Sequence, residues 1–264
     1  MNNNQKMNDL EIVNYYLQGL NTVEIAKKYN SYNTSIRRVL LRNNVLLRSN
    51  HEVKSFLKEK KFENPLTKDE FYWLGLLISD GCISNGALSL SLKEEDKYML
   101  ENFKNYLGNG IKLNKYFHKK HNHYEYYVKV KNRSLNKNLQ NLANFINKSF
   151  EARLYIEINW DIMRGLLDAD GSVGCYYHRN CKICRTRIIL TTISVDLLNQ
   201  VKNFYDLYNI KYSISTSKKN SLNVISVNHQ DMCLKMYDYL YKDANLYLIR
   251  KKEKFKSLLQ RFNR

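Results

Sequence analysis

Two aspartates, Asp80 and Asp170, close similar apolar runs 90 residues apart, and a glycine follows each of them. The runs read WLGLLISDG for residues 73–81 and MRGLLDADG for residues 163–171. Both have the character of helices, so each carboxylate stands at a helix C-terminus, where the helix dipole disfavours it by a few tenths to ~1 kcal/mol. This placement indicates that the acids serve chemistry rather than helix stability.

A cation between the two acids would remove this conflict. If the helices pair, the carboxylates face each other and repel unless one takes up a proton or a cation lies between them. Carboxylate and carbonyl oxygens suit Mg²⁺, and the carbonyls of Ser79 and Ala169 directly precede the acids. We expect about two or three divalent ions here, which would activate water and stabilise a leaving oxygen, the chemistry of phosphodiester hydrolysis.

Glycines inside the two runs indicate how the helices would meet. Gly75 and Gly165 occupy the same place in the two runs, although glycine costs about 1 kcal/mol in a helix interior. A helix tolerates that cost where another backbone must come close, so we expect these helices to pack glycine against glycine. Gly81 and Gly171 are expected to end the helices as C-terminal cap residues.

The chain has 264 residues, a formal net charge of +18 and 44% hydrophobic residues. This charge attracts polyanions, of which nucleic acid is the commonest, although a low-GC genome would also enrich lysine whatever the function. No apolar run approaches the ~20 residues of a membrane helix, and the N-terminus, MNNNQKMNDL, lacks a signal-peptide pattern. We therefore expect a soluble protein that is not secreted and is cytoplasmic, or resides in the organelle or phage-infected cell that encodes it.

Residues 1–50 are predicted to form a small helical module. The first helix, residues 9–17, has Leu10 and Leu17 on its apolar face, Asn21 or Thr22 caps a second helix, and residues 34–42 form a third. The order of helix, short turn and basic helix resembles the helix-turn-helix modules of recombinases and regulators. A plain three-helix packing module is the alternative. DNA contact is expected from Arg37, Arg38 and Arg42.

The rest of the chain reads as a tandem duplication that follows a linker. Residues 51–66 are polar and end near the only proline, Pro65, so they are predicted to be the linker. Residues 67–150 and 151–264 each show the order helix, two strands, helix, two strands and helix (αββαββα), with Thr67 and Asn159 as helix caps. The expected fold class is therefore α+β with a small all-α domain at the N-terminus.

Together these features resemble the LAGLIDADG homing endonuclease family in its single-chain form with two motif copies. The resemblance covers residues 67–264 and rests on the two motifs and the αββαββα repeat around each. It implies a monomer with pseudo-two-fold symmetry, whose saddle-shaped antiparallel sheets lie in the DNA major groove. The metal-binding acid of each motif falls on Asp80 and Asp170 here. Each acid would cleave one strand across the minor groove of a long, asymmetric DNA target.

The two motif copies depart from the family pattern in ways that leave these acids unchanged. The first copy has Trp73 and Leu74 where the motif has Leu-Ala, and Ile78 where the sixth position usually has Asp. The corresponding residue of the second copy, Asp168, is expected to cap a helix or to face solvent.

The resemblance also implies a basic residue from each half near the scissile phosphates. The matching phrases, FINKSF and YLYKDA, nominate Lys148 and Lys242. Both would polarise water or offset phosphate charge. Solvated lysines at helix ends are the alternative interpretation.

Polar residues that alternate along the expected strands are candidates for reading bases, because alternate side chains share one face of a sheet. Arginine suits guanine edges and lysine suits phosphates, whereas an exposed sheet face without DNA contact would show the same alternation. The candidates on the strands and the turn are Ser89, Ser91, Lys93, Lys115, Lys129, Arg185, Arg187, Thr191, Ser215, Lys218 and Lys219.

The segment GCYYHRNCKIC, residues 174–184, places four zinc-ligand types three residues apart. This spacing is tight for one tetrahedral Zn²⁺ site. Because the chain has five cysteines, an odd number, and no secretory signal, we prefer reduced cysteines in a basic, DNA-facing loop to zinc or a disulfide framework. The four residues are Cys175, His178, Cys181 and Cys184.

The sequence thus favours a site-specific double-strand DNA endonuclease of homing type, which would serve intron mobility, with a helix-turn-helix that extends its DNA contact. The alternative class is a non-cleaving nucleic-acid binder, either an intron RNA maturase or a transcriptional regulator. The two classes differ in whether Asp80 and Asp170 are needed for function.

Overall fold

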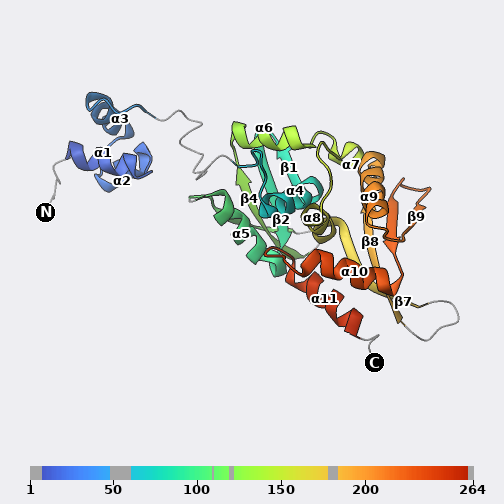
Figure 1. The fold of residues 1–264 in the computed structure, drawn as a ribbon. Helices are drawn as coiled ribbons and strands as arrows, with labels where there is room; N and C mark the ends of the chain where they lie inside the picture. The colour runs from blue at the N-terminus through green and yellow to red at the C-terminus, as the bar shows by residue number, and fades with distance from the viewer. Residues whose placement is uncertain (1–7, 48–60, 109, 119–121, 178–183, 261–264) are drawn as a thin grey trace. The chain divides into compact units, whose positions relative to one another are not determined.

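The computed structural model describes residues 8–47, 61–108, 110–118, 122–177 and 184–260 (Figure 1). Its contacts divide the chain into two compact units, residues 1–55 and residues 56–264. Within the described part of the chain, no helix is long and apolar enough to cross a membrane.

The first unit packs three helices: α1 (Asp9–Leu17), α2 (Thr22–Lys28) and α3 (Asn33–Arg42). Asn21 caps α2 in a capping box with Glu24. The prediction that Leu10 and Leu17 lie on the apolar face of α1 is wrong, since each is 70% exposed. The buried face carries Ile12 and Tyr16, one turn apart. The core consists of Ile12, Tyr16, Ile25, Ala26, Ile36, Val39 and Leu40.

The second unit is the expected duplication. The first repeat contains α4 (Lys68–Asp80), β1 (Gly81–Ser84), β2 (Ala87–Lys93), the 3-10 helix η2 (Glu94–Asp96), α5 (Lys97–Leu107), β3 (Leu113–His118), β4 (His123–Val130) and α6 (Arg133–Leu142). The second contains α8 (Trp160–Asp170), β7 (Gly171–Tyr177), β8 (Cys184–Thr192), α9 (Val195–Leu207), β9 (Ser213–Thr216), β10 (Asn223–Val227), α10 (Gln230–Tyr241) and α11 (Ile249–Gln260). The sheets have equivalent strand orders, β1-β2-β4-β3 and β7-β8-β10-β9. The repeats therefore share one topology.

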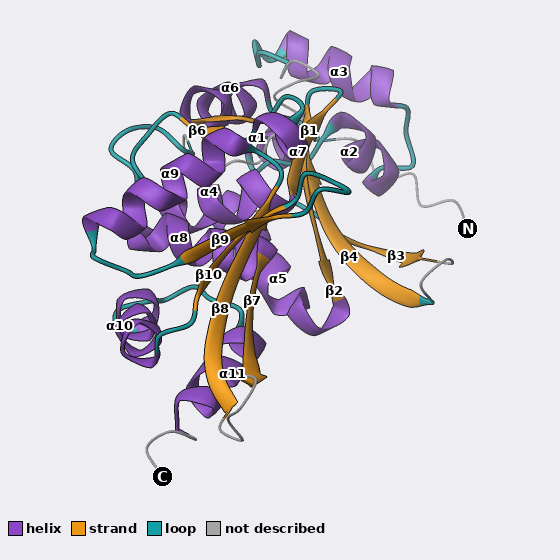
Figure 2. Cartoon of the chain, turned by 90° about the vertical axis from the view of Figure 1, so that its right-hand side faces the viewer, coloured by secondary structure: helices purple, strands orange, loops and turns teal. Residues whose placement is uncertain are grey.

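Both sheets are antiparallel, and the helices pack on one side of them (Figure 2). The strand β2 shows why: Leu88, Leu90 and Leu92 are buried against the helices, whereas Ser91 and Lys93 are exposed on the other face. One hydrophobic core runs through both repeats. The sheets consequently keep one polar face each.

Local signals in the sequence set the boundaries of several elements. Thr67 and Glu70 form a capping box at the start of α4, and Asn159 caps α8. Asn85 and Gly86 both have positive φ, 49° and 72°, as a tight two-residue hairpin turn between β1 and β2 requires. The expected helix caps at Thr67 and Asn159 are confirmed.

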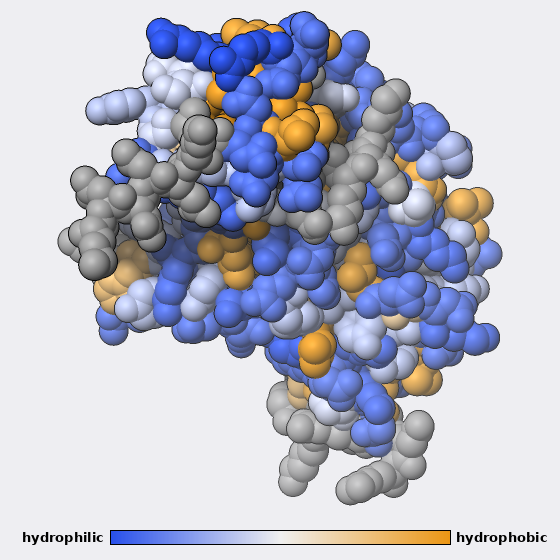
Figure 3. Space-filling model, turned by 90° about the vertical axis from the view of Figure 1, so that its left-hand side faces the viewer, coloured by the Kyte–Doolittle hydropathy of each residue, from blue (hydrophilic) through white to orange (hydrophobic). Residues whose placement is uncertain are grey.

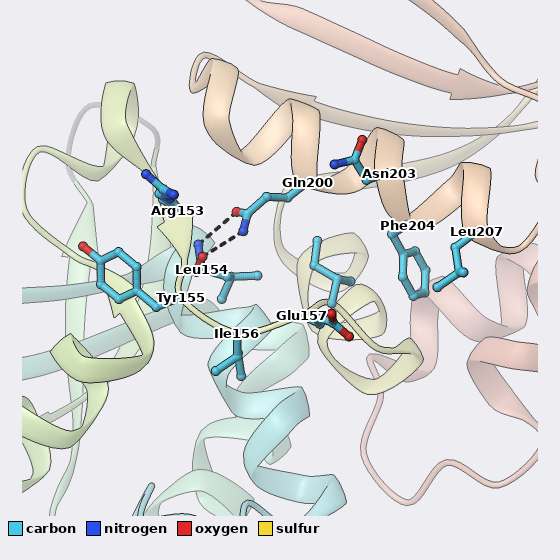
Figure 4. Close-up of a pocket in the computed structure, with 10 residues that line it drawn as sticks. Arg153, Leu154, Tyr155, Ile156, Glu157, Gln200, Asn203, Phe204 and Leu207 are labelled. Carbon is cyan, nitrogen blue, oxygen red and sulfur yellow. Dashed lines mark hydrogen bonds between the residues drawn. The ribbon is translucent and has the colours of Figure 1, made fainter.

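The connection between the repeats contains a short pair of strands. The helix α6 ends at Leu142, because Ala143–Asn144 (β5) pairs with Arg153–Leu154 (β6), and the short α7 (Lys148–Glu151) lies between them. The side-chain amide of Gln200 donates to the Leu154 carbonyl oxygen at 2.8 Å and accepts from the Leu154 N–H at 3.0 Å (Figure 4). This contact ties the connection to α9.

The cysteine-rich segment is only partly described. Cys175 is disulfide-bonded, so the expectation of reduced cysteines is wrong for this residue, and its sulfur is not a zinc thiolate. An odd cysteine count argues against a disulfide framework but not against a single bridge. His178, Cys181 and the side chain of Cys184 lie outside the described residues.

Candidate paired-acid active site

The helices α4 and α8 meet backbone to backbone at two glycines. A Cβ atom on Gly75 would lie 2.1 Å from the carbonyl oxygen of Ile162, and one on Gly165 would lie 2.2 Å from that of Tyr72. No side chain fits at such distances. The expected glycine-to-glycine packing is confirmed, and it brings the C-termini of the two helices together.

A second pair of glycines turns the chain from each helix into the sheet. Gly81 and Gly171 directly follow the acids, but they are extended, with φ of −73° and −89°, rather than left-handed as at a usual helix C-cap. They are needed for space, because a Cβ would lie 2.6 Å from the Leu77 oxygen and 2.4 Å from the Leu167 oxygen.

The charge of Asp170 acts on Asp80. Asp80 and Asp170 are the last residues of α4 and α8 and are exposed at their tips. Protein atoms around the Asp80 carboxyl reduce its hydration, and this desolvation, with the negative charge of Asp170, raises the pKa of Asp80 to about 6. The positive charges of Lys148 and Lys251 oppose that rise. The site therefore concentrates negative charge that a cation would relieve.

The structure places Lys148 at this site. Lys148 begins α7, and its half-buried ammonium group donates to the carbonyl oxygens of Ser79 and, at 3.4 Å, Ile78. Burial lowers its pKa, and the charges of Asp80 and Asp170 oppose that change. The Ser79 carbonyl, a candidate metal ligand, thus already has a cation beside it.

The structure does not place Lys242 there. Lys242 lines a pocket with Lys68 and Trp160, at the N-terminal ends of α4 and α8. That position is about 15 Å from the acids, because α8 has 11 residues. The phrase YLYKDA lies at the end of α10, before the last helix has begun.

Lys251, in the first turn of α11, takes the place expected for Lys242. Its ammonium group donates to the carbonyl oxygens of Leu167 at 2.8 Å, Ala169 at 3.3 Å and Gly171 at 2.7 Å. Burial lowers its pKa to about 8. The sequence signal for Lys251 is the pair of lysines in IRKKEK, at the start of the last helix. Lys148 likewise stands at the start of a helix.

Asp168 is buried rather than exposed, with 2% of its surface accessible. Its Oδ2 atom accepts hydrogen bonds from the Tyr72 hydroxyl at 2.9 Å and the Leu248 N–H at 2.8 Å. Burial raises its pKa to about 6. The expectation that it faces solvent is wrong, because Asp168 joins α8 to α4 and to the start of α11.

Most candidates for base reading on the first sheet share its open face. The register pairs Ser89 with Lys129 across β2 and β4, so these side chains lie on the face that also carries Ser91 and Lys93. Lys115 lies on the opposite face, because β3 pairs the core-facing Leu113 with Val128 and Lys115 with Tyr126. There it contacts Glu94 at 3.7 Å, which corrects the expectation of a shared face.

On the second sheet, Arg185, Arg187 and Thr191 alternate with buried residues of β8 and share the open face. Ser215 lies on the same face, because Val224 of β10 pairs with Thr191 on one side and with Ser215 on the other. The Thr191 hydroxyl also donates to the Asp170 carbonyl at 3.2 Å, so Thr191 adjoins the paired acids. Lys218 and Lys219 are exposed in the turn after β9.

The candidates of the N-terminal unit are exposed on α3. Arg37 and Arg38 face solvent, and Arg42 pairs with Asp9 at 2.6 Å. On the face of the molecule in Figure 3, hydrophilic residues prevail and hydrophobic ones form small separate groups.

The donor set of the paired-acid site suits a hard cation. Among the described residues, no three His, Cys, Asp or Glu side chains lie where together they could hold a metal ion. A metal here would therefore bind the carboxylates of Asp80 and Asp170 and backbone carbonyls such as those of Ser79 and Ala169. Oxygen ligands completed by water are what Mg²⁺ prefers.

Comparison with known proteins agrees with this geometry. The family model of the LAGLIDADG-like domain matches residues 161–263. The second repeat is a LAGLIDADG-like domain. The duplicated unit as a whole has the LAGLIDADG fold, since it is similar to the homing endonuclease I-GzeII in complex with its DNA target, at a TM-score of 0.54 and 12% identity over 73% of this chain and 90% of that one.

One further solved structure and one further sequence are similar to this chain. The homing endonuclease I-WcaI, bound to its DNA recognition sequence, matches with a TM-score of 0.53 and 16% identity over 81% of this chain and 96% of that one. The uncharacterized protein MJ0314 of Methanocaldococcus jannaschii is 28% identical over 200 residues, 70% of this chain and 71% of its own. The likeness to the solved structures shows the fold alone.

Proposed function

We propose that this chain is a site-specific, Mg²⁺-dependent double-strand DNA endonuclease. The single observation that carries the proposal is the pair of acids, Asp80 and Asp170, held at the ends of two helices that touch through glycine. Helix stability disfavours an acid at that position, so each copy keeps its acid against a local cost. Similar proteins with this fold are homing endonucleases in complex with DNA targets.

Each group at the site has a role in this proposal. Asp80 and Asp170, with the carbonyls of Ser79 and Ala169, would hold the metal, which supplies Lewis acidity and an activated water when bound. Lys148 and Lys251 lie against the same helix ends, where an ammonium group offsets charge that develops on a phosphate. Each repeat thus provides one acid and one lysine, as two-strand cleavage requires.

The open faces of the two sheets would hold the DNA. Both faces carry polar and basic side chains, and the net charge of +18 favours a phosphate backbone. The N-terminal unit would act as a helix-turn-helix and lengthen the contact through its exposed α3 arginines. We propose residues 1–50 as that DNA-binding module, 51–66 as a linker, and 67–150 and 151–264 as the repeats of a monomeric enzyme.

A binding selection followed by a cleavage assay tests the proposal. Duplexes retained from a random library in Ca²⁺ are cloned into a plasmid and then incubated with the protein in Mg²⁺. We expect linear plasmid from the wild type, and retained binding without linear product from Asp80→Asn and from Asp170→Asn. Asp196→Asn, which changes an exposed acid on α9, serves as the control and should cleave normally.

Two results would overturn the proposal. Wild-type protein that binds its selected DNA yet leaves it intact in Mg²⁺ would identify a non-cleaving binder, such as a regulator. Retention of intron RNA in preference to duplex, with both acids dispensable, would instead identify a maturase.

A further inference from the structure

The open faces of the two sheets differ in the kind of cation they present. On the first sheet the cations of the open face are lysines, Lys93 and Lys129, and none of the strands β1 to β4 contains an arginine. On the second sheet, β8 presents Arg185 and Arg187. An ammonium group is a compact point charge, whereas a guanidinium group has a planar fork that fits two acceptors at once.

Arg187 has open space on one side. The register places it directly opposite Gly174 of β7, and a Cβ atom built on Gly174 would meet no atom within 4 Å. A side chain at that position would fill the space beside the guanidinium group. A planar ligand that lies on the open face can therefore approach Arg187 from the Gly174 side.

On the other side, a chain of hydroxyl groups holds Arg187. Its Nη2 atom donates to Ser226 Oγ of β10 at 3.3 Å, and Ser226, which is 3% exposed, lies 3.0 Å from Ser213 Oγ of β9. Asn228 donates to the same Ser213 oxygen at 3.4 Å. Burying the Ser226 hydroxyl in the strand NVISV costs free energy unless the hydroxyl is hydrogen-bonded. Its bonds to Arg187 and Ser213 meet that need, and we take the arrangement to hold the guanidinium group in position.

We infer that Arg187 is a specificity-determining residue that reads guanine in the half-site beneath the second sheet. Guanine presents its O6 and N7 acceptors side by side in the major groove, and the arginine fork matches that pair better than any other base edge. The lysines of the first sheet contact phosphates or single acceptors and discriminate bases less. The inference rests on the DNA binding of the proposed function but not on cleavage.

Binding-site selection with the cleavage-deficient Asp80→Asn protein tests this inference. The selected duplexes should carry a guanine at one fixed position in one half-site only. In competition binding, replacing that guanine should weaken binding by about 5- to 150-fold, the range for a bidentate contact. Arg187→Met should remove this preference, and Arg187→Lys, which keeps the charge, should lose most of it. Ser226→Ala should reduce the preference without abolishing it.

Lys129→Met is the matched control, because it removes a cation from the open face of the other sheet. It should weaken binding to all sequences alike and leave the guanine preference unchanged. A preference that survives in both Arg187 variants overturns the inference, as does a selected site without that guanine. Duplexes that show the guanine but resist wild-type cleavage in Mg²⁺ refute the proposed nuclease alone, and a failure to retain any duplex refutes both.

Discussion

Replacing Gly165 with alanine tests whether the contact of α4 and α8 assembles the site. The new Cβ atom would lie 2.2 Å from the Tyr72 oxygen and 2.6 Å from the Leu76 nitrogen, whereas ordinary contact begins near 3.4 Å. Both neighbours are backbone atoms and cannot rotate away, so the helices must separate by roughly 1 Å. Overpacking costs about 1–3 kcal/mol, occasionally more, and a rigid backbone neighbour places this site at the upper end.

Two terms therefore decide the sign of the effect. Alanine is better than glycine in a helix interior by about 1 kcal/mol, which leaves a net loss of about 2 kcal/mol. In a unit of this size, such a loss lowers Tm by about 4–8 °C. Because the acids are at the ends of the same helices, Gly165→Ala should also slow cleavage of a selected target at temperatures where the protein remains folded.

Gly174→Ala is the matched control for stability, since a Cβ there meets nothing within 4 Å. Thermal unfolding by circular dichroism, with each variant at the same concentration and pH, measures both effects. Gly165→Ala with the Tm of the wild type would refute the reasoning. Equal losses in the two variants would also refute it, because they would show a general sensitivity to lost glycine rather than a helix contact.

Two further predictions concern charge at the site. Asp80→Asn should raise the Tm of the metal-free protein at pH 7.5, because the pKa of the Asp80 carboxyl is about 6 in the folded protein, above its ordinary value of 3.8. Between about pH 6 and pH 3.8 folding takes up a proton, so wild-type stability rises as the pH falls. A Tm difference between Asp80→Asn and the wild type that does not shrink between pH 7 and pH 4 would contradict this. Lys251→Met should slow cleavage about 10²-fold, whereas Lys242→Met should leave the rate near that of the wild type. Time courses on one selected target measure both rates, and the reverse order would restore Lys242 to the site.

Much of the fold follows from local signals in the sequence. Thr67 and Glu70 mark the start of α4, Asn85 and Gly86 mark the first hairpin, and apolar periodicity separates helices from strands. A helix cap, followed by an apolar run that ends in an acid and a glycine, occurs near the start of each repeat, which is why the duplication and the paired acids can be predicted together. A cap or a turn acts within a few residues, so the sequence alone carries it.

The errors arose where distant parts of the chain decide the outcome. The phrase YLYKDA points to Lys242, but the lysine at the site is set by the start of α11. That start is held by a buried hydrogen bond between Asp168 and Leu248, 80 residues apart in the sequence. The sequence does not place Lys115, because β3 is an edge strand whose face is set by its register with β4. A shift of one residue in that register exchanges the faces, and no local feature of the strand fixes it.

The two halves deliver equivalent lysines by different means, which shows what duplication within one chain permits. In the first repeat the sixth motif position is Ile78, and Lys148 reaches the helix end from the short α7. In the second repeat Asp168 takes that position and holds the start of α11, which places Lys251. In a symmetric dimer of identical chains, an acid at the sixth motif position would occur in both halves. Both halves would then bear the free-energy cost of burying it. A single chain can instead keep the two paired acids alike while the supporting contacts diverge, and the arginines of β8, which the strands of the first sheet lack, show that the open faces of the two sheets have diverged in the same way.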